Sequence, residues 1–495
     1  MDEKEELVTA TEPTPQEEDG GSVTSKRNIK NILIVLIGNI FTIVSSILVG
    51  FFVPKMMNVD AFGYYKTFAL YFEYTTFLSV GFSDGIYLLY AGTSFEKLDK
   101  PRFRLFSKLL LASQAILSIL VCVVSVFFIK TDYGFIFFFV GLSIFLSNLL
   151  NYYQYLSRVT ERYGELTVRD MLKSILNIAS VVVLFVLYKM GKMSTLNFKL
   201  YIVIYVSILA FIVIIYSINY RHIIFGKSTK LKDDLSIIGT IFKMGIPLMI
   251  ANFINSFILI IDKQFVNVLF DKYTYGIYAF AYSMLGFITT AISAISTVLF
   301  PVLKRLNENA LKEKYVNLIS AITMVVAICL SGYFPILWIC QRYLNNYIAS
   351  MEFFRIILPG LMICSPITMI MYNYYKSMGA IVEYFIKSII VLAVAFLFDL
   401  GAYLIFKNTD YAPKAISIAS ILTFVVWYVV VEFKFYRMWK LNYVKNMLYL
   451  ALIAGAFYGI TYIPNIYVSF GVWMGALIVI TVLFQFKIIK NKFRI

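Results

Sequence analysis

The sequence predicts an all-α polytopic membrane protein with fourteen transmembrane helices. Of its 495 residues, 60% are apolar and only 15% are charged, and the mean hydropathy is +0.79. Ordinary soluble domains are about half apolar and about a quarter charged, and long soluble chains divide into domains instead of building one larger core. The apolar residues also form long continuous runs, with basic residues gathered between alternate runs. These observations exclude secreted, disordered, coiled-coil and ordinary soluble-enzyme classes.

Each apolar run is long enough to cross the hydrocarbon core, for which about 20 residues suffice in a helix. Lipid offers the backbone no water to bond, so a run must be helical or belong to a closed barrel. Continuous rather than alternating hydrophobicity favours helices. The runs are residues 31–53, 65–90, 107–129, 134–156, 171–188, 199–219, 245–268, 276–300, 316–339, 353–375, 385–406, 414–433, 446–463 and 467–487.

The basic residues orient these helices. With the N-terminus placed in the cytoplasm, the inner connections and ends hold 32 of the 44 Lys and Arg residues, and the outer segments hold the other 12. Cytoplasmic loops of membrane proteins carry an excess of Lys and Arg. The alternation therefore predicts an even number of spans with both termini in the cytoplasm, and it explains the basic net charge without nucleic-acid binding.

The chain divides into five segments. Residues 1–28 are an acidic tail with too few apolar residues to build a core, so we expect it to be disordered and cytoplasmic. It lacks the basic n-region of a signal peptide. The rest comprises a first six-helix lobe (29–220), an amphipathic cytoplasmic linker (221–244), a second six-helix lobe (245–433), and helices 13 and 14 with a basic cytoplasmic tail (434–495).

The linker carries an apolar stripe at helical spacing, which predicts an interfacial helix between the lobes. The stripe consists of Leu231, Leu235, Ile238 and Phe242. Gly226-Lys227-Ser228 in the same linker is not a P-loop, because Arg221 stands where that motif needs its first glycine.

No connection is long enough for a soluble catalytic domain, and no cysteine or histidine spacing indicates a metal site. We therefore predict that the chain is not an enzyme and holds no resident cofactor.

Three short motifs recur with the same offset in span number. Each motif in one span has a similar motif six spans later, which predicts an internal duplication. Because six is even, the two lobes (helices 1–6 and 7–12) run parallel around a central cavity, as in transporters, and helices 13 and 14 lie outside the repeat. The pairs are Phe62-Gly63-Tyr64-Tyr65 with Tyr275-Gly276-Ile277-Tyr278, Asn151-Tyr152-Tyr153 with Asn373-Tyr374-Tyr375, and Lys173-Ser174-Ile175 with Lys387-Ser388-Ile389.

Ionisable residues inside the spans are the first candidates for a transport pathway, because they are costly in a bilayer. On a continuous helix with about 100° per residue, Lys66, Glu73 and Asp84 of the second span share one face. This pattern predicts a polar stripe that lines a cavity. The alternative is pairing between helices, or snorkelling of the residues near the helix ends, which suits Lys66 and Asp84 better than Glu73.

Further candidates lie on three other spans. Asn, Thr, Ser and Asp side chains can bond sugar hydroxyls, or they can join neighbouring helices. An arginine can bind phosphate through two parallel hydrogen bonds, or it can snorkel outward, here beside Glu352. The candidates are Asn39, Thr42 and Ser46 on the first span, Asn255, Asp262 and Lys263 on the seventh, and Arg355 on the tenth; we expect Asp399 on the eleventh to be interfacial.

The chain resembles the polysaccharide flippases (Wzx-type) of the polysaccharide transporter family, within the multidrug/oligosaccharidyl-lipid/polysaccharide exporter superfamily. Fourteen spans in a 12+2 pattern agree with this resemblance. The motifs that carry it are Gly50-Phe51-Phe52-Val53-Pro54-Lys55, Phe62-Gly63-Tyr64-Tyr65, Gly81-Phe82-Ser83-Asp84-Gly85-Ile86, Gly245-Ile246-Pro247-Leu248-Met249, Ile261-Asp262-Lys263 and Tyr275-Gly276-Ile277-Tyr278.

The resemblance implies alternating-access movement of an undecaprenyl-diphosphate-linked oligosaccharide, a repeat unit of O-antigen, capsule or exopolysaccharide. The movement runs from the inner to the outer leaflet of the bacterial plasma membrane. We expect a functional monomer whose partners are this lipid-linked glycan, membrane lipids and polysaccharide polymerase machinery. Coupling to H⁺ or Na⁺ is compatible with Glu73 or Asp262.

Two alternatives from the same superfamily stay open: a multidrug cation exporter and a peptidoglycan-precursor flippase. Relatives that flip the peptidoglycan precursor use arginines on spans one, two and eight. Spans one and eight of this chain have no cation in their interior, which favours the oligosaccharide branch.

Overall fold

The computed structural model describes residues 21–304, 306, 308–440 and 444–492, and all regular secondary structure in these ranges is helical. The predicted all-α class is therefore confirmed. The α-helices are α1 (Gly21–Met56), α2 (Val59–Thr75), α3 (Phe82–Tyr90), α4 (Lys100–Phe128), α5 (Asp132–Val159), α6 (Tyr163–Lys189), α7 (Phe198–Asn219), α8 (Arg221–Ile224), α9 (Leu231–Ile258), α10 (Ile261–Leu269), α11 (Lys272–Lys304), α12 (Glu308–Cys329), α13 (Tyr333–Tyr343), α14 (Ser350–Ile357), α15 (Leu361–Pro366), α16 (Tyr372–Ser377), α17 (Ile381–Phe406), α18 (Ala412–Trp439), α19 (Val444–Ile460) and α20 (Ile466–Lys492).

Within the described part of the chain, ten helical segments are long and apolar enough to cross a membrane. Helices also occupy all fourteen predicted apolar runs, but four runs are interrupted. The second run comprises α2 and α3, the seventh α9 and α10, the ninth α12 and α13, and the tenth α14, α15 and α16. The sequence did not predict these breaks, because hydropathy alone does not reveal them.

The break in the second run has a clear backbone cause. After α2 comes a 3₁₀ turn, Thr76–Ser79, and then Val80 and Gly81 adopt left-handed conformations with φ of 52° and 74°. A Cβ on Gly81 would lie 2.5 Å from the carbonyl carbon of Gly245 on α9. Glycine at position 81 therefore permits both the turn and a close approach of two helix backbones.

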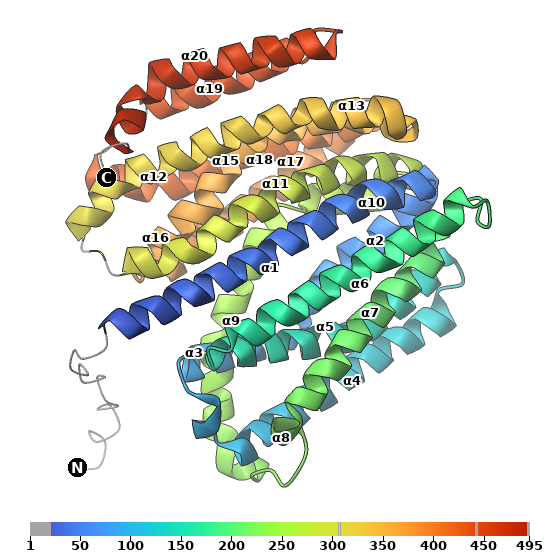
Figure 1. Cartoon of the computed structure of the whole chain (residues 1–495), viewed down its shortest axis with the longest axis vertical. Coiled ribbons are helices and arrows are strands. Elements are labelled where there is room, and N and C mark those ends of the chain that lie inside the picture. The colour runs from blue at the N-terminus through green and yellow to red at the C-terminus, as the bar shows by residue number, and fades with distance from the viewer. Residues whose placement is uncertain (1–20, 305, 307, 441–443, 493–495) are drawn as a thin grey trace.

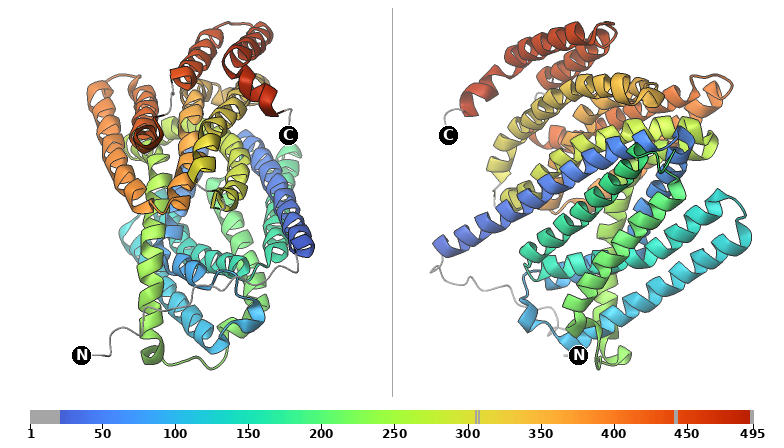
Figure 2. Two further views of the ribbon diagram at one scale, coloured as in Figure 1. Left: turned by 90° about the vertical axis from the view of Figure 1, so that its left-hand side faces the viewer. Right: turned by 45° about the vertical axis from the view of Figure 1, so that its right-hand side comes forward.

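The helices from the two halves of the sequence form two groups. In Figure 1, α2–α8 (blue to green) lie in one part of the molecule and α11–α18 (yellow to orange) in the other, with α19 and α20 along the far edge. Helix α1 packs on α6 and on α11. Figure 2 shows α9 extending from the first group, where it packs on α3, toward the second group.

The predicted linker is not a separate helix. Residues 231–244 are the first half of α9, which continues without a break to Ile258. Asp234, which is 2% exposed, accepts a 2.8 Å bond from Arg102 Nε and so joins α9 to the start of α4. This half of α9 therefore packs on the first helix group, and Leu231 and Leu235 of the predicted stripe remain exposed.

The predicted acidic tail lies largely outside the described residues, since only 21–28 are described, and these already belong to α1. The last residues of the predicted basic tail, 493–495, also lie outside them.

The tyrosines of one repeated motif pair join neighbouring helices within their own group. Tyr152 bonds to Ser107 on α4, the third run, and Tyr374 bonds to the carbonyl of Leu311 on α12, the ninth run. Tyr153 stacks on Tyr216 and Tyr220 of the sixth run. Its counterpart Tyr375 donates to the carbonyl of Val431 in the twelfth run.

The glycines of the first motif pair meet each other. A Cβ on Gly63 would lie 2.1 Å from the carbonyl oxygen of Lys272, and a Cβ on Gly276 would lie 2.4 Å from that of Val59. Each glycine thus faces the carbonyl four residues before the other glycine. We call this contact between α2 and α11 the outer seam.

Candidate functional site

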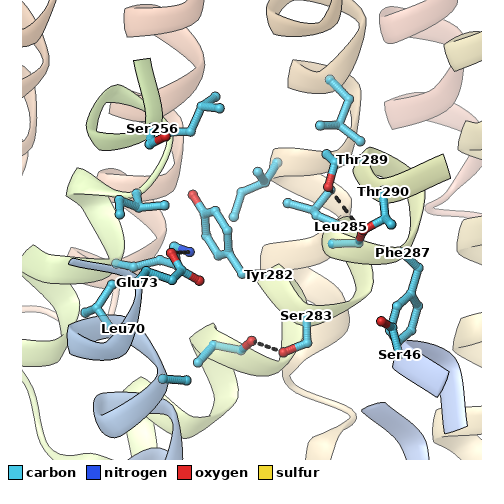
Figure 3. Close-up of a pocket in the computed structure, with 18 of the residues that line it drawn as sticks. Ser46, Leu70, Glu73, Ser256, Tyr282, Ser283, Leu285, Phe287, Thr289 and Thr290 are labelled. Carbon is cyan, nitrogen blue, oxygen red and sulfur yellow. Dashed lines mark hydrogen bonds and ion pairs between the residues drawn. The ribbon is translucent and has the colours of Figure 1, made fainter. Parts of the chain in front are cut away.

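A cavity of about 660 Å³ lies between the two helix groups. Helix α2 lines it from the first group, α11, α14, α15 and α18 line it from the second, and α1, α9 and α10 complete it. Figure 3 shows Glu73 of α2 next to Tyr282 of α11 inside this cavity, with Ser46 and Phe287 at one side. The cavity is thus built from residues far apart in the sequence and brought together by the broken second and seventh runs.

Three ionisable side chains line the cavity. Lys66 and Glu73 lie two turns apart on one face of α2, and Lys263 comes from the start of α10. Lys263 Nζ lies 4.0 Å from Glu73 Oε2 and 5.4 Å from the ring centre of Tyr282. Lys66 Nζ lies over the rings of Phe62 and Tyr65, at 5.2 and 5.4 Å. Two lysines and one glutamate give these lining groups a net positive charge.

Hydroxyl groups supply the rest of the polar lining. Ser46 donates to the carbonyl of Thr42 at 2.8 Å, and Ser283 donates to that of Ala279 at 2.8 Å. Each hydroxyl proton is therefore used within its own helix, while the oxygen lone pairs can accept hydrogen bonds from a ligand. The Tyr282 hydroxyl is buried and has no hydrogen-bond partner among the described residues. The cavity can thus both accept hydrogen bonds and donate them.

Of the ten sequence candidates, Ser46, Lys66, Glu73 and Lys263 line this cavity. Asp84 does not, which corrects the predicted stripe of three residues. The stripe assumed a continuous helix, and the turn at residues 76–81 rotates α3 away from α2. Asp84 is 5% exposed and accepts a 2.8 Å hydrogen bond from Tyr155.

Of the other candidates, Thr42, Asn255, Asp262 and Arg355 also lie off the cavity lining. Thr42 donates to the carbonyl of Gly38 within α1, Asn255 lies on α9, and the side chain of Asn39 is outside the described part. Arg355 lies on α14 with its guanidinium 4.2 Å from the ring centre of Tyr462, in the turn before α20. The structure therefore does not bring Arg355 together with Lys66 and Lys263.

Asp262 belongs to a second buried polar cluster. It is 2% exposed and accepts 2.8 Å hydrogen bonds from Tyr278 and Ser420. Asp399 on α17, predicted to be interfacial, is instead 1% exposed, and neither of its carboxylate oxygens has a hydrogen-bond partner in the described ranges. Helix α17, which carries Asp399, packs on α10, which carries Asp262, so the two buried carboxylates belong to adjacent helices.

A buried pair of carboxylates is stable only when a proton or a cation offsets the repulsion, because an isolated buried charge is costly. Asp262 is the neighbour of Lys263 in the chain, and its carboxylate accepts a hydrogen bond from the backbone N–H of Lys263 at 2.7 Å. A change of charge at this cluster therefore acts directly on the first turn of α10, which carries a cavity lysine.

Sequence reasoning did not select Tyr282, which lines the cavity, and it expected Asp399 at the interface instead of in the buried cluster. Tyr282 lies seven residues after Tyr275, so both project from one face of α11 into the cavity. That spacing was visible in the sequence. Asp399 gave no comparable signal, since its partner lies on a different run.

A family model described as polysaccharide biosynthesis protein matches residues 103–335. Among solved structures, the lipid II flippase MurJ in an inward closed conformation has a TM-score of 0.67 at 14% identity, with 93% of this chain and all of that chain covered. This chain has the fold of the exporter superfamily. The family model and this fold agree with the resemblance stated above from short motifs, and the ten long apolar helical segments of the described residues are those of a multi-pass membrane protein.

Two further structures of that superfamily have the same fold. An inward-facing MATE multidrug resistance transporter has a TM-score of 0.55 at 13% identity, with 81% of this chain and 94% of that chain covered. A transporter from Pyrococcus furiosus Vc1 (DSM3638) has a TM-score of 0.51 at 13% identity, with 84% and 96% covered. No curated protein sequence matches the chain. At these identities the likeness defines the fold alone.

Proposed function

We propose that this protein is a flippase, not an enzyme. It moves an undecaprenyl-diphosphate-linked oligosaccharide from the inner to the outer leaflet of the bacterial plasma membrane. It does so by alternating access, with fourteen transmembrane helices and both termini in the cytoplasm. The observation that supports this most is the cavity between the two helix groups, in which Lys66, Glu73 and Lys263 lie among hydroxyl groups.

The cavity chemistry suits a glycan joined to a diphosphate. Each hydroxyl that enters hydrocarbon without a partner costs roughly 4–8 kcal/mol, so a sugar headgroup needs a polar path. The serine oxygens and the ammonium groups of Lys66 and Lys263 offer such partners. The membrane potential, negative inside, favours outward movement of the diphosphate by about 2.3 kcal/mol per charge per 100 mV.

The sign of the cavity charge argues against the multidrug cation exporter. Two lysines and one glutamate line the cavity, and this combination repels a cation. The peptidoglycan-precursor flippase is disfavoured for a different reason. Along the sequence of α11, no Lys or Arg lies between Lys272 and Lys304, and α1 has none between Lys30 and Lys55.

We further propose that transport is coupled to H⁺ or Na⁺ at the Asp262–Asp399 pair rather than at Glu73. Glu73 is 53% exposed and ion-paired, whereas Asp399 is buried without a bonded partner in the described residues. Asp399→Asn is expected to leave one carboxylate, which abolishes the dependence of export on pH or on Na⁺. A variant whose export still follows the same ion gradient would contradict this assignment.

The test of the main proposal is rescue of a flippase-deficient strain, scored as polymerised surface glycan. A parallel arm depletes the peptidoglycan-precursor flippase, and a third measures uptake and efflux of an aromatic cation. Rescue in the first arm alone is the expected result. Rescue only in the second or third arm would replace the proposed substrate by the corresponding alternative.

A further inference from the structure

An apolar groove of about 670 Å³ lies between α13 and α20, remote from the central cavity. Trp473 Nε1 on α20 donates to Ser331 Oγ at 2.9 Å, which closes one end of the groove. Ser331 and Gly332 lie at this closed end. The walls are Phe334, Pro335 and Trp338 on one side and Ile466, Tyr467 and Phe470 on the other.

Helix α13, which forms one wall of the groove, has about the length of one leaflet. Ser331, Phe334, Trp338 and Arg342 lie three or four residues apart, so they follow one another along one face of the chain at α13. Eleven residues of helix span about 16 Å, roughly half of a hydrocarbon core about 30 Å thick. With the predicted orientation, α13 ends on the outer side, and the groove therefore occupies the outer leaflet.

Two basic residues lie near the open end of the groove. The guanidinium of Arg342, which is exposed, lies 5.9 Å from the ring centre of Trp338. Lys55 at the end of α1 donates to the carbonyl of Tyr343 at 2.5 Å, so a second cation lies beside the first. The groove thus combines apolar walls with positive charge at headgroup level.

The charge decides which lipid the groove prefers. Apolar side chains give an acyl chain no advantage over the surrounding lipid tails, so the chain itself provides little selectivity. Charge-assisted hydrogen bonds to phosphate are strong, and basic residues at the membrane surface attract anionic headgroups. Selectivity must therefore come from Arg342, because the Lys55 ammonium already donates to the Tyr343 carbonyl.

We propose that this groove is a resident site for an anionic phospholipid of the outer leaflet, such as phosphatidylglycerol. One acyl chain lies along the groove and the phosphate bonds to Arg342. The bond from Trp473 to Ser331 closes the groove at mid-membrane, which excludes the much longer undecaprenyl chain of the transported lipid. The site rests on the predicted orientation but not on the proposed transport activity.

The chain contains its own reporter for this site. Of its four tryptophans, Trp338 is 37% exposed, whereas Trp427, Trp439 and Trp473 are buried. The purified full-length protein is placed in phosphatidylcholine vesicles that contain brominated phosphatidylglycerol or brominated phosphatidylcholine at equal mole fraction. Bromine quenches tryptophan fluorescence on contact, and Trp338→Phe should remove most of the quenching.

We expect phosphatidylglycerol to associate about fivefold more strongly than phosphatidylcholine, the ratio expected for one cation at the membrane surface. Arg342→Gln should bring this ratio to about one, and Lys407→Gln at the exposed outer end of α17 should not change it. High salt should lower the ratio in the wild-type protein, which tests the charge without any substitution.

Three results would overturn the proposal. The first is equal quenching by both lipids in the wild-type protein at low salt. The second is a phosphatidylglycerol preference that survives Arg342→Gln. The third is displacement of the brominated lipid by stoichiometric undecaprenyl phosphate, or cross-linking of two copies through cysteine at position 338, because either would assign the groove to another occupant. None of these readouts depends on flipping, so they remain informative if the proposed function fails.

Discussion

Glu73→Gln separates a transport role of the cavity ion pair from a structural one. The Lys263 and Glu73 side chains are 16% and 53% exposed, and their charged atoms are 4.0 Å apart. An ion pair with one partner in water contributes about 0.2–1 kcal/mol to stability. Glutamine keeps the size of the side chain and removes its charge. We therefore expect the free energy of unfolding to fall by less than about 1 kcal/mol and membrane abundance to stay normal.

Export should respond far more strongly than stability. The three charged side chains give the cavity a net charge of about one positive unit, and Glu73→Gln raises it by another unit. Lys263 then lacks its counter-charge and holds the diphosphate more tightly, which slows release. A hydrogen bond to a charged group contributes about 1.5–3 kcal/mol, so we expect export to fall by about tenfold or more.

The assay is surface glycan in the flippase-deficient strain at matched membrane abundance, with thermal unfolding of the purified protein alongside. Glu352→Gln is a matched control, because Glu352 on α14 is also half exposed and ion-paired, with Lys414, but lies off the cavity lining. The double variant Glu73→Gln/Lys263→Gln restores the wild-type net charge and should recover export. Wild-type export by Glu73→Gln, or a double variant worse than either single one, would refute the charge-balance argument.

Three further outcomes are expected from other parts of the fold. Gly63→Ala places a Cβ against the Lys272 carbonyl and should open the outer seam. A cysteine at position 283 should then react faster with a reagent added from outside. Gly401→Ala is the control, because its Cβ meets open space, and it should not change that rate. Lys66→Ala should reduce export and Arg355→Ala should not, because of these two residues only Lys66 lines the cavity. An equal loss of export in both variants would show that both residues bind the headgroup. Fourteen spans with an inner N-terminus require outside labelling of cysteines at Thr131, Asn345 and Asn408 and none at Ser228 and Asn309, and outside labelling at 228 would refute this topology.

Hydropathy and short motifs were sufficient to predict the all-helical class, whereas the duplication stays a prediction. They were insufficient where a break in a helix changes the direction in which a side chain points. Lys66 and Glu73 share a face because α2 is continuous between them, whereas Asp84 follows the left-handed residues Val80 and Gly81. Glycine was visible at position 81, but no local pattern reveals its left-handed φ or the close approach of α9.

The surroundings of charged residues were the second feature that the sequence did not predict. Asp399 near a predicted helix end was compatible with an interfacial residue, and only the packing of α17 against α10 and α18 encloses it beside Asp262. Arg355 illustrates the opposite case, because a membrane cation can be satisfied by an aromatic ring such as Tyr462 instead of a ligand. Both outcomes depend on partners that come from other parts of the sequence.

The reciprocal contact of Gly63 and Gly276 bears on how this chain arose. Each glycine occupies the same place in its motif, and each faces the carbonyl four residues before the other. A symmetric homodimer of one six-helix subunit would make this contact at its two-fold axis, where a residue meets its own copy. In such an ancestor any substitution would have changed both sides at once. Under the duplication that the motif pairs predict, fusion into one gene would release this constraint: Phe62 and Tyr275 differ, as do Tyr64 and Ile277, while both positions hold glycine.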